Sequence, residues 1–479
     1  MRARASVARA RALALAPALA LLLAARGASS TATVIAAQDP RVVWAGRTEL
    51  LADGASVRFD WPAVAAYVSV AGAGSIALNV TSETSGLNRV LTHIFVGATP
   101  YEMTRAWVPP GNSVINVAAN IFGNSSVRVF FELEPSFNGA GADAGYVVHG
   151  FVLDAGDAVQ QAHRAHRLEI VGDSISAGYG ASGVGGDCPV MDYTSGNYGT
   201  YNRQICDAFD AECSVVAWSG KGMYENCCDS GETMPSYYLQ TRGGSAYATD
   251  WDFTRFVPDA IIINLGELAR RSLASRAARQ CRLTVALLRT GTNDFGHDAG
   301  PAWEANFTAT YVEFVQNATR RYGKPQLPVF LGQGNMNNGA PLHDALQAAA
   351  AAINAAGGNA FYLDMRAGPT DGCGNHPGVL GHAAMAAAAK PVIAQAMGWT
   401  WTYAAGFVPA GSDAAPPATN VSLADAQAAC LAIPTCAAIT FAGAVPDPAP
   451  ALIPLVYYKN SSGVVAAAGW QSYVALARA

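Results

Sequence analysis

Short hydrophobic runs dominate the first third of the chain. Between about residues 42 and 156, runs rich in Val, Phe and Tyr alternate with Gly, Asn, Ser and Pro, and no run long enough for a helix interrupts them. Short strands at this spacing predict a β-sandwich or jelly-roll domain over residues 40–156. The runs are VVWAG, ASVRFDW, AYVSVAG, SIALNVT, HIFVG, SSVRVFFELE and YVVHGFVLD.

A different pattern follows, in which strand-like runs alternate with segments of helical spacing. The alternation predicts βαβ units and, over residues 165–400, a flavodoxin-like, doubly wound α/β domain with a parallel sheet. The run DAIIINLG is typical of a buried strand because its β-branched stretch is unbroken. The other strands expected are RLEIVG, CSVVAWS, LPVFLGQG and AFYLDM, and the helices are GTYNRQICDAFD, WEANFTATYVEFVQNATRRYG, PLHDALQAAAAAINAAG and PGVLGHAAMAAAAKPVIAQAMG.

The tail, residues 411–479, is expected to form a small separate module. It begins with GSDAAPPATN, which is typical of a linker, and continues with a predicted helix and strand in SLADAQAACLAIPTCAAITF. Cys430 and Cys436 are close enough in sequence to form a disulfide. A module with so small a core would need that disulfide for its stability.

Residues 1–30 have the pattern of a secretory signal peptide. Four arginines precede Leu13, an apolar run continues to Ala25, and small residues follow it. Cleavage is expected between about Gly27 and Ala32. An uncleaved membrane anchor is the alternative, but the run is too short to span a bilayer comfortably. The sequence therefore predicts a secreted, extracellular protein with no membrane partner after cleavage.

Composition agrees with secretion and excludes one class of partner. The chain is 51% hydrophobic and 14% charged with a net charge of -5, and no basic stripe interleaves with aromatic residues, so no nucleic-acid partner is expected. The nine cysteines predict disulfides, and their odd number leaves one thiol over. Six N-x-S/T sequons are candidate glycan sites, at Asn79, Asn124, Asn306, Asn317, Asn420 and Asn460.

Four residues could together support serine catalysis. Ser174 lies in GDSIS, Gly220 in AWSGKG and Asn293 in GTNDF, each after a strand-like run, and His376 lies in GCGNHPGVLGH. A serine becomes a useful nucleophile only if a base takes its proton and donors hold the resulting oxyanion. Because ligands bind beyond the carboxyl ends of parallel strands, these residues are expected to converge at one edge of the sheet.

Each of the four also has a purely structural reading. Ser174 could cap a helix, and Gly220 and Asn293 could be turn residues. His376 could be a helix N-cap with Pro377 at the first helical position. That position would also bring the imidazole beside the edge where Ser174 lies. Convergence of four features on one edge favours the catalytic interpretation.

Metal chemistry has less support. His376 and His382 are six residues apart, so a helix would put them on different faces. No H-E-x-x-H or Cys/His ligand spacing occurs. No metal and no cofactor are therefore expected. His382 reads as a helix-surface or core residue, and neither His297 nor His343 has a partner that the sequence can identify.

Two aspartates could be taken as a carboxylate pair for glycoside cleavage. They are Asp173, next to Ser174, and Asp294, next to Asn293. The interpretation preferred here is that each braces the loop that carries its neighbour.

In combination, these blocks resemble the SGNH, or GDSL, hydrolases. GDSIS, SGKG, GTND and HPGVLGH match the four blocks of that superfamily. More narrowly, GDSISAGYG, AWSGKGM, TMPSYY, FVPDAIIINLG, GTNDF and DGCGNHPGVLGH resemble carbohydrate esterase family 2, which removes acetyl groups from polysaccharides such as xylan. WAGRTELLADGASVRFDWPAV with GFVLDAGD resembles its N-terminal β-sandwich, so that the resemblance covers roughly Val42 to Trp399.

The resemblance implies roles for the four residues. Ser174 would be the nucleophile and His376 the general base, then the acid. The backbone N–H groups of Ser174 and Gly220 and the side chain of Asn293 would form the oxyanion hole. The tail resembles a PAN/apple-like module through its two cysteines, ITF, YYK and GWQSY, and such a module would bind carbohydrate or protein.

The first departure from the family concerns the acid that orients His376. The superfamily commonly has Asp three residues before this His, and some family 2 esterases have it two before. Here those positions are Cys373 and Gly374, while Asp371 stands five before. The family also tolerates a Ser–His dyad in which a backbone carbonyl orients the imidazole. A dyad is therefore predicted, without Asp371.

The second departure is an insertion. Removing Glu267–Gly291, 25 residues with six arginines and one acid, restores the family's INLGTNDF and leaves eight cysteines, because Cys281 is lost. Gly266–Glu267 and Thr290–Gly291 can be encoded with splice-donor and splice-acceptor sequences. The hypothesis is a retained intron. The alternative is a genuine loop insertion, although a structureless loop of this length in a compact domain is uncommon.

The sequence thus predicts a secreted serine ester hydrolase that removes acetyl groups from polysaccharide. One alternative is a GDSL-type esterase or lipase acting on other acyl esters. The other is a non-catalytic glycan-binding protein.

Overall fold

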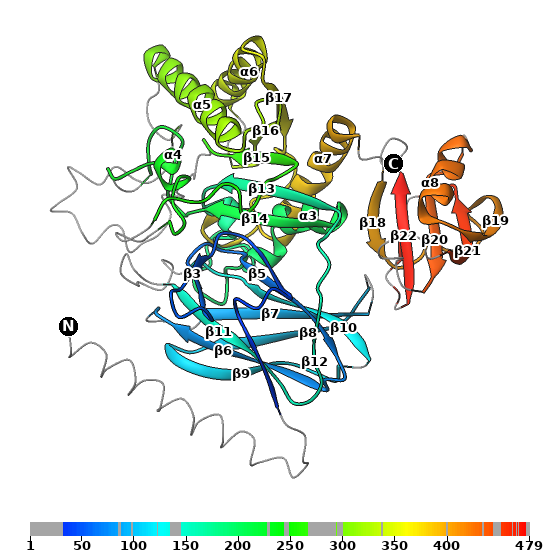
Figure 1. Ribbon diagram of the computed structural model, residues 1–479. Helices are drawn as coiled ribbons and strands as arrows, with labels where there is room; N and C mark the ends of the chain where they lie inside the picture. The colour runs from blue at the N-terminus through cyan, green and yellow to red at the C-terminus, as the bar shows by residue number, and fades with distance from the viewer. Residues whose placement is uncertain are drawn as a thin grey trace, which may run out of the picture.

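A computed structural model describes most of the chain (Figure 1). The described residues are 32–84, 88–96, 99–121, 123–134, 145–227, 230–243, 249–266, 294, 300–336, 339–398, 401–433, 435–443, 452–461, 463–465, 467 and 469–475. The expected signal peptide, the segment 267–291, Asn293 and His297 lie outside them. None of the described helices is long and apolar enough to cross a membrane.

The N-terminal region consists of two antiparallel sheets. One has the order β3 (Glu49–Leu50), β4 (Val57–Phe59), β11 (Tyr146–Leu153), β6 (Ser75–Ser82) and β9 (Gly111–Ala119), with β1 (Thr33–Ala36) paired to β11. The other has the order β12 (Asp157–Val159), β5 (Ala65–Ala71), β10 (Asn124–Phe131), β7 (Asn88–Val96) and β8 (Thr99–Val108), with β2 (Val42–Ala45) paired to β5.

Side chains from both sheets meet in one hydrophobic core. Phe59 and Tyr146 of the first sheet contact Phe131 of the second, with ring centroids 4.7 and 5.5 Å apart. The alternating runs of the sequence therefore correspond to strands with one buried face. β8 and β9 were not among the expected strands, because polar residues such as Thr104 and Arg105 interrupt the apolar pattern there.

The predicted parallel sheet is confirmed. Its order is β14 (Ala211–Ala217), β13 (His166–Gly172), β15 (Ala260–Asn264), β16 (Pro328–Gln333) and β17 (Asn359–Asp364). All its strand pairs are parallel. Counted from β13, this is the order 2-1-3-4-5 of a flavodoxin-like sheet. The order reverses at β13, so the chain leaving β13 enters the crevice in which such folds bind ligands.

Helices cover both faces of this sheet (Figure 1). The faces are recognisable from two separate core clusters. α3 (Tyr201–Ala208) and α7 (Val379–Met397) pack against side chains such as Ile170 and Ile262. α5 (Pro301–Arg321) and α6 (Ala340–Ala355) pack against the opposite face, which includes Ile261 and Ile263. The short helices α2 (Ser174–Ala177) and α4 (Met234–Tyr237) lie in the loops after β13 and β14.

The N-terminal region is joined to the α/β domain by a buried ion pair. Arg47 lies just after β2, and its Nη2 is 3.1 Å from Oε1 of Glu169 in β13, with both side chains almost fully buried. The hydroxyls of Tyr238 and Tyr322 donate to the other oxygen of Glu169, at 2.6 and 2.9 Å. Removal of one member of such a network would leave a buried charge uncompensated, so the two parts are expected to move as one body.

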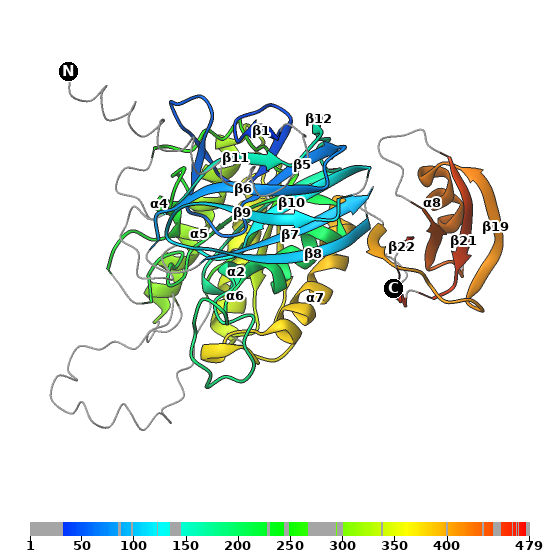
Figure 2. The same cartoon turned by 90° about the horizontal axis from the view of Figure 1, so that it is seen from below.

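The C-terminal region is a further antiparallel sheet with one helix, and it lies to one side of the rest of the molecule (Figure 2). The strand order is β18 (Trp401–Ala405), β22 (Trp470–Ala475), β20 (Ala438–Ala442), β21 (Ile453–Lys459) and β19 (Asp413–Val421), with α8 (Leu423–Ala432) packed against it. The expected Cys430–Cys436 disulfide is present.

Two details of this region differ from expectation. The segment expected to be a linker forms β19, and β18 extends the sheet to before residue 411. β19 is an edge strand with irregular register. Edge strands accommodate proline because one side of the strand needs no ladder partner, and this explains Pro416 and Pro417 in a strand.

Candidate active site

Ser174 lies directly beyond the carboxyl end of β13, where α2 begins. Asp173 is the N-cap of this helix, and its Oδ1 accepts a hydrogen bond of 3.0 Å from the Ile175 N–H. The cap fixes the tight turn from strand to helix, and Ser174 is left half-buried at the rim. The cap is thus Asp173, so the structural reading of Ser174 as a helix cap does not hold.

The structure places His376 against Ser174, although 202 residues separate them. Ser174 Oγ is 2.9 Å from Nε2 of His376. On the other side of the ring, Nδ1 is 3.1 Å from the carbonyl oxygen of Gly374, an arrangement in which an Nδ1–H donates. This tautomer leaves Nε2 as the acceptor that a general base requires. Gly374 has φ +63°, a left-handed conformation suited to glycine, and this turns its carbonyl toward the ring.

Burial lowers the pKa of His376 to about 4, opposed by the hydrogen bond to Gly374. The imidazole is therefore neutral near pH 7 and able to accept a proton. The alternative interpretation of His376 as a helix N-cap is wrong, since α7 begins at Val379 with Gly378 as its N-cap. His376 instead ends the 3-10 turn Cys373–Asn375 in an extended conformation.

Asp371 has a different task from orienting the histidine. Its Oδ1 accepts from the N–H groups of Gly378 and Gly381 at 2.8 and 3.2 Å, at the start of α7. Cys373, three residues before His376, forms a disulfide with Cys188. The described contacts of the imidazole are therefore with Ser174 and a backbone carbonyl, and the Ser–His dyad stays a prediction.

Gly220 lies in the turn after β14, next to the end of β13. Its φ of +85° is a conformation that glycine adopts without strain. Among the described residues, no acceptor lies within hydrogen-bonding distance of the N–H of Ser174 or of Gly220. Unpaired N–H groups at this edge are the kind of donors that an oxyanion hole needs.

Asn293 lies outside the described residues, but its neighbour Asp294 is described. The Asp294 carboxylate is fully buried and accepts from the N–H groups of residues 223, 224 and 225 at 2.7, 2.7 and 2.9 Å. Burial raises the pKa of Asp294 to about 6, opposed by these three hydrogen bonds. Asp294 is thus hydrogen-bonded to the turn that contains Gly220.

The other described histidines have structural partners. His382 is buried, and its Nδ1 accepts from the Tyr201 N–H at 3.3 Å, so it is a core residue. Burial lowers its pKa to about 3. His343 Nδ1 is 2.9 Å from the hydroxyl of Tyr362. Within the part of the chain that the structure describes, no group of three His, Cys, Asp or Glu side chains could hold a metal ion.

Two features of the site were missed by the sequence reasoning. The Cys188–Cys373 disulfide ties the loop after α2 to the turn before His376, and the nine cysteines alone left the pairing open. The ring of Tyr179 lies 4.8 Å from that of His376, at 48° to it. Its position in GDSISAGYG, one turn beyond Ser174, was the available signal.

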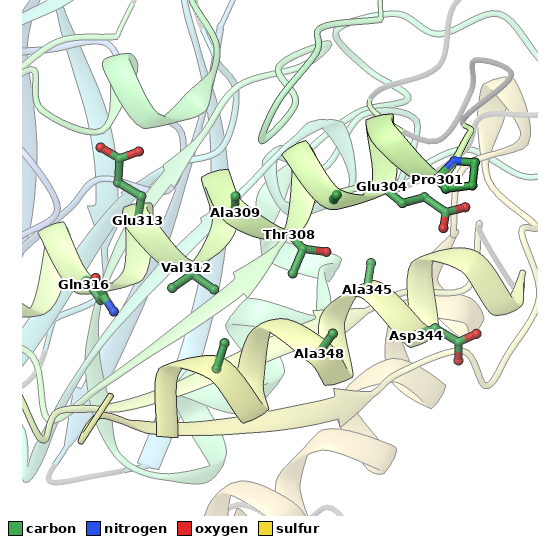
Figure 3. Close-up of a pocket in the computed structure, with 12 residues that line it drawn as sticks. Pro301, Glu304, Thr308, Ala309, Val312, Glu313, Gln316, Asp344, Ala345 and Ala348 are labelled. Carbon is green, nitrogen blue, oxygen red and sulfur yellow. The ribbon is translucent and has the colours of Figure 1, made fainter. Parts of the chain in front are cut away.

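A separate groove of about 710 Å³ lies between α5 and α6 (Figure 3). Small and apolar side chains such as Val312, Ala345 and Ala348 line it, and its lining also includes acidic residues such as Glu304 and Asp344. Neither Ser174 nor His376 contributes to it, so it is not part of the candidate active site.

Known proteins that are similar to this chain include esterases. No family model matches the sequence. The acetylxylan esterase / glucomannan deacetylase of Cellvibrio japonicus is 24% identical over 395 residues, which cover 78% of this chain and 93% of that protein. The cellulase/esterase CelE of Acetivibrio thermocellus is 25% identical over 171 residues, 36% of this chain and 17% of that protein.

Solved structures of carbohydrate esterases are similar to this chain in fold. A family two carbohydrate esterase from Cellvibrio japonicus has a TM-score of 0.62 at 22% identity, covering 77% of this chain and 99% of its own. A carbohydrate esterase family 2 enzyme with a carbohydrate binding domain from Corynascus thermopiles has a TM-score of 0.58 at 26% identity, covering 75% and 100%. The chain is thus similar in sequence and fold to family 2 carbohydrate esterases, and these similarities support its interpretation as a carbohydrate acetyl esterase.

Proposed function

We propose that this protein is a secreted carbohydrate O-acetyl esterase that removes acetyl groups from polysaccharide by serine acyl transfer. The observation that carries the proposal is the contact of Ser174 Oγ with a neutral His376 whose other nitrogen is held by a backbone carbonyl. A nucleophile, its base and an orienting group within hydrogen-bonding reach of one another are the arrangement that activates a serine.

In the proposed mechanism, His376 Nε2 takes the Ser174 proton while Oγ attacks the acetyl carbonyl carbon. The carbonyl oxygen becomes an oxyanion, which the N–H groups of Ser174 and Gly220 and the side chain of Asn293 stabilise. The C–O bond to the sugar breaks, and the sugar oxygen receives its proton from His376. A water molecule, deprotonated by His376, then attacks the acetyl-enzyme, and acetate leaves as Ser174 regains its proton.

The domain assignments within this proposal rest on the family resemblance of the sequence and on the sheets that the structure describes. The two N-terminal sheets with their shared core are proposed to be the family's β-sandwich, and the α/β domain an SGNH hydrolase domain. Names of the relatives point to acetylated xylan or glucomannan as substrate. The C-terminal sheet is proposed to be a PAN/apple-like module that binds carbohydrate or protein. Secretion rests on the expected signal peptide.

The experiment that tests the central claim compares wild type with Ser174→Ala on 4-nitrophenyl acetate. The variant should lose nearly all activity and keep its melting temperature, because the hydroxyl has little packing role. Loss of a nucleophile costs roughly 10⁶-fold in rate. Activity within about tenfold of wild type would refute Ser174 as the nucleophile, whereas a wild type without activity would favour the glycan-binding alternative.

Two further measurements refine the assignment. Asn293→Ala should lower kcat by roughly 10²–10³, the usual cost of one oxyanion donor, with KM nearly constant. A change mainly in KM would make Asn293 a substrate-binding residue instead. Acetate release from acetylated xylan, acetylated glucomannan and acyl lipids then separates a carbohydrate esterase from an esterase of other acyl groups.

A further inference from the structure

Two buried glutamates of the N-terminal region link it to the candidate active site. Glu132 and Glu134 follow the end of β10 and are only 1% and 4% exposed. Glu134 contacts the turn after β14 directly, while Glu132 reaches the loop after α2 through its backbone carbonyl and through Arg89. Buried charges are expensive and are retained in proteins where they have specific partners, so these contacts call for an explanation.

Glu134 contacts the residue immediately before Gly220. Its Oε2 accepts a hydrogen bond of 2.9 Å from the Ser219 N–H. A hydrogen bond to a carboxylate is shorter and stronger than one between neutral groups. The bond fixes the Trp218–Ser219 peptide plane, from which the chain enters Gly220 at φ +85°.

The other side of the same turn is held independently. The Gly220 carbonyl accepts from the Cys227 N–H at 3.0 Å, and Asp294 holds the N–H groups of residues 223–225. The Gly220 N–H, which has no acceptor among the described residues, therefore lies between two anchored segments. Glu134 is the anchor on the strand side.

Glu132 supports the Ser174 side in a comparable way. Its carboxylate pairs with Arg89, whose Nη2 donates to the Ser195 carbonyl at 2.5 Å. The backbone carbonyl of Glu132 accepts from the Asn197 N–H at 3.0 Å. Asn197 Nδ2 in turn donates to the carbonyl of Ser176 in α2, at 2.5 Å. Thus both turns with unpaired N–H groups are braced from the same short segment of the N-terminal region.

We propose that Glu134 is a positioning residue for the esterase reaction, which directs the Gly220 N–H toward the oxyanion by holding the Ser219 N–H. This inference rests on the proposed function, because it takes Gly220 as an oxyanion donor. Transition-state stabilisation by such a donor depends on its direction, and a displacement of about 1 Å can cost roughly 10²-fold in rate. The N-terminal region would then be required for catalysis itself.

The test uses the full chain with Glu134→Ala and Glu134→Gln. Glu134→Ala should lower kcat by roughly tenfold to a hundredfold, with KM within about twofold, because the oxyanion forms only in the transition state. Its pH profile should keep the wild-type shape, since Glu134 exchanges no proton. Glu134→Gln retains a carbonyl oxygen that can accept from Ser219, so it should restore most of kcat.

Arg255→Ala is the matched control for general loosening of the domain boundary. Arg255 lies in the α/β domain, and its guanidinium donates to the carbonyl and hydroxyl oxygens of Thr48 in the N-terminal region. Its loss should lower the melting temperature comparably while kcat stays within about twofold, since it breaks cross-boundary hydrogen bonds outside the catalytic machinery.

Three outcomes would overturn the proposal. They are a kcat of Glu134→Ala within threefold of wild type, an equal loss in Glu134→Gln, and an equal loss in Arg255→Ala. Ser174→Ala, measured in parallel, separates this failure from failure of the proposed function. If Ser174→Ala is inactive while Glu134→Ala is unimpaired, the esterase assignment stands and only the positioning role is refuted.

Discussion

Replacement of Asp371 by asparagine separates a Ser–His dyad from a Ser–His–Asp triad. The substitution keeps an oxygen at the position of Oδ1, so the N–H groups of Gly378 and Gly381 can keep their acceptor. What is lost is one negative charge at the N-terminus of α7. His376 keeps its own partner, because the Gly374 carbonyl accepts from Nδ1.

A Ser–His dyad and a Ser–His–Asp triad predict very different effects of Asp371→Asn on activity. Loss of a charge near a helix N-terminus costs about 0.3–1 kcal/mol in the free energy of unfolding. In the dyad reading, kcat/KM should stay within about threefold of wild type. Replacement of a triad aspartate by asparagine lowers kcat by roughly 10⁴, or about 5.4 kcal/mol at 1.36 kcal/mol per tenfold change.

The assay is kcat/KM for 4-nitrophenyl acetate, with the melting temperature of each variant measured in parallel. Asp364→Asn is the matched control, because it removes a carboxylate at the end of β17 that pairs with Arg366. If Asp371→Asn loses several orders of magnitude while the control does not, the carboxylate acts on His376 and the dyad is wrong.

Three further predictions concern the same site. Since His376 must be neutral to act as a base and burial lowers its pKa to about 4, kcat/KM should fall only as the pH drops through about 4, and an acid limb centred at pH 6.5 or above contradicts this. The double variant Cys188→Ser with Cys373→Ser releases the turn that precedes His376. It should lower kcat and the melting temperature, and cost roughly 2–5 kcal/mol in the free energy of unfolding. An unchanged kcat and melting temperature would show that the disulfide does not position His376. The chain without Glu267–Gly291 should be the more stable and more active esterase, and the transcript should lack those codons; a full chain equal or better on both measures would show that the segment is a true loop.

Local sequence patterns were sufficient to predict the buried strands of the parallel sheet. Unbroken β-branched runs such as Ile261–Ile263 identify buried parallel strands, because both faces of such a strand are covered by helices. Placement of Ser174 and His376 at one edge followed from the rule that parallel strands share their carboxyl ends. Ser174 directly follows β13, and His376 lies between β17 and α7. These positions bring Ser174 Oγ to 2.9 Å from His376 Nε2.

Other parts depended on partners that are distant in the sequence. Pro416 and Pro417 argued for a linker, and only the place of β19 at the edge of its sheet makes them compatible with a strand. His376 and Pro377 resembled a helix start, but the cap of α7 is Gly378, which Asp371 holds. A pattern along the chain carries no information on which carboxylate of another domain reaches a given turn, so Glu134 could not be singled out.

A Ser–His dyad depends more on stabilisation of the oxyanion, and less on stabilisation of the imidazolium, than a Ser–His–Asp triad does. In a triad, an aspartate stabilises the imidazolium that forms when the serine proton is transferred. In the described site, the Gly374 carbonyl offers His376 a dipole in place of a full negative charge, and burial disfavours the imidazolium further, as the lowered pKa of His376 indicates. A larger share of transition-state stabilisation must then come from donors to the oxyanion. Backbone donors can be directed only through the chain on either side of them. In the proposed mechanism, Glu134 and Asp294 anchor the turn of Gly220 from both sides, so that its N–H can serve as such a donor.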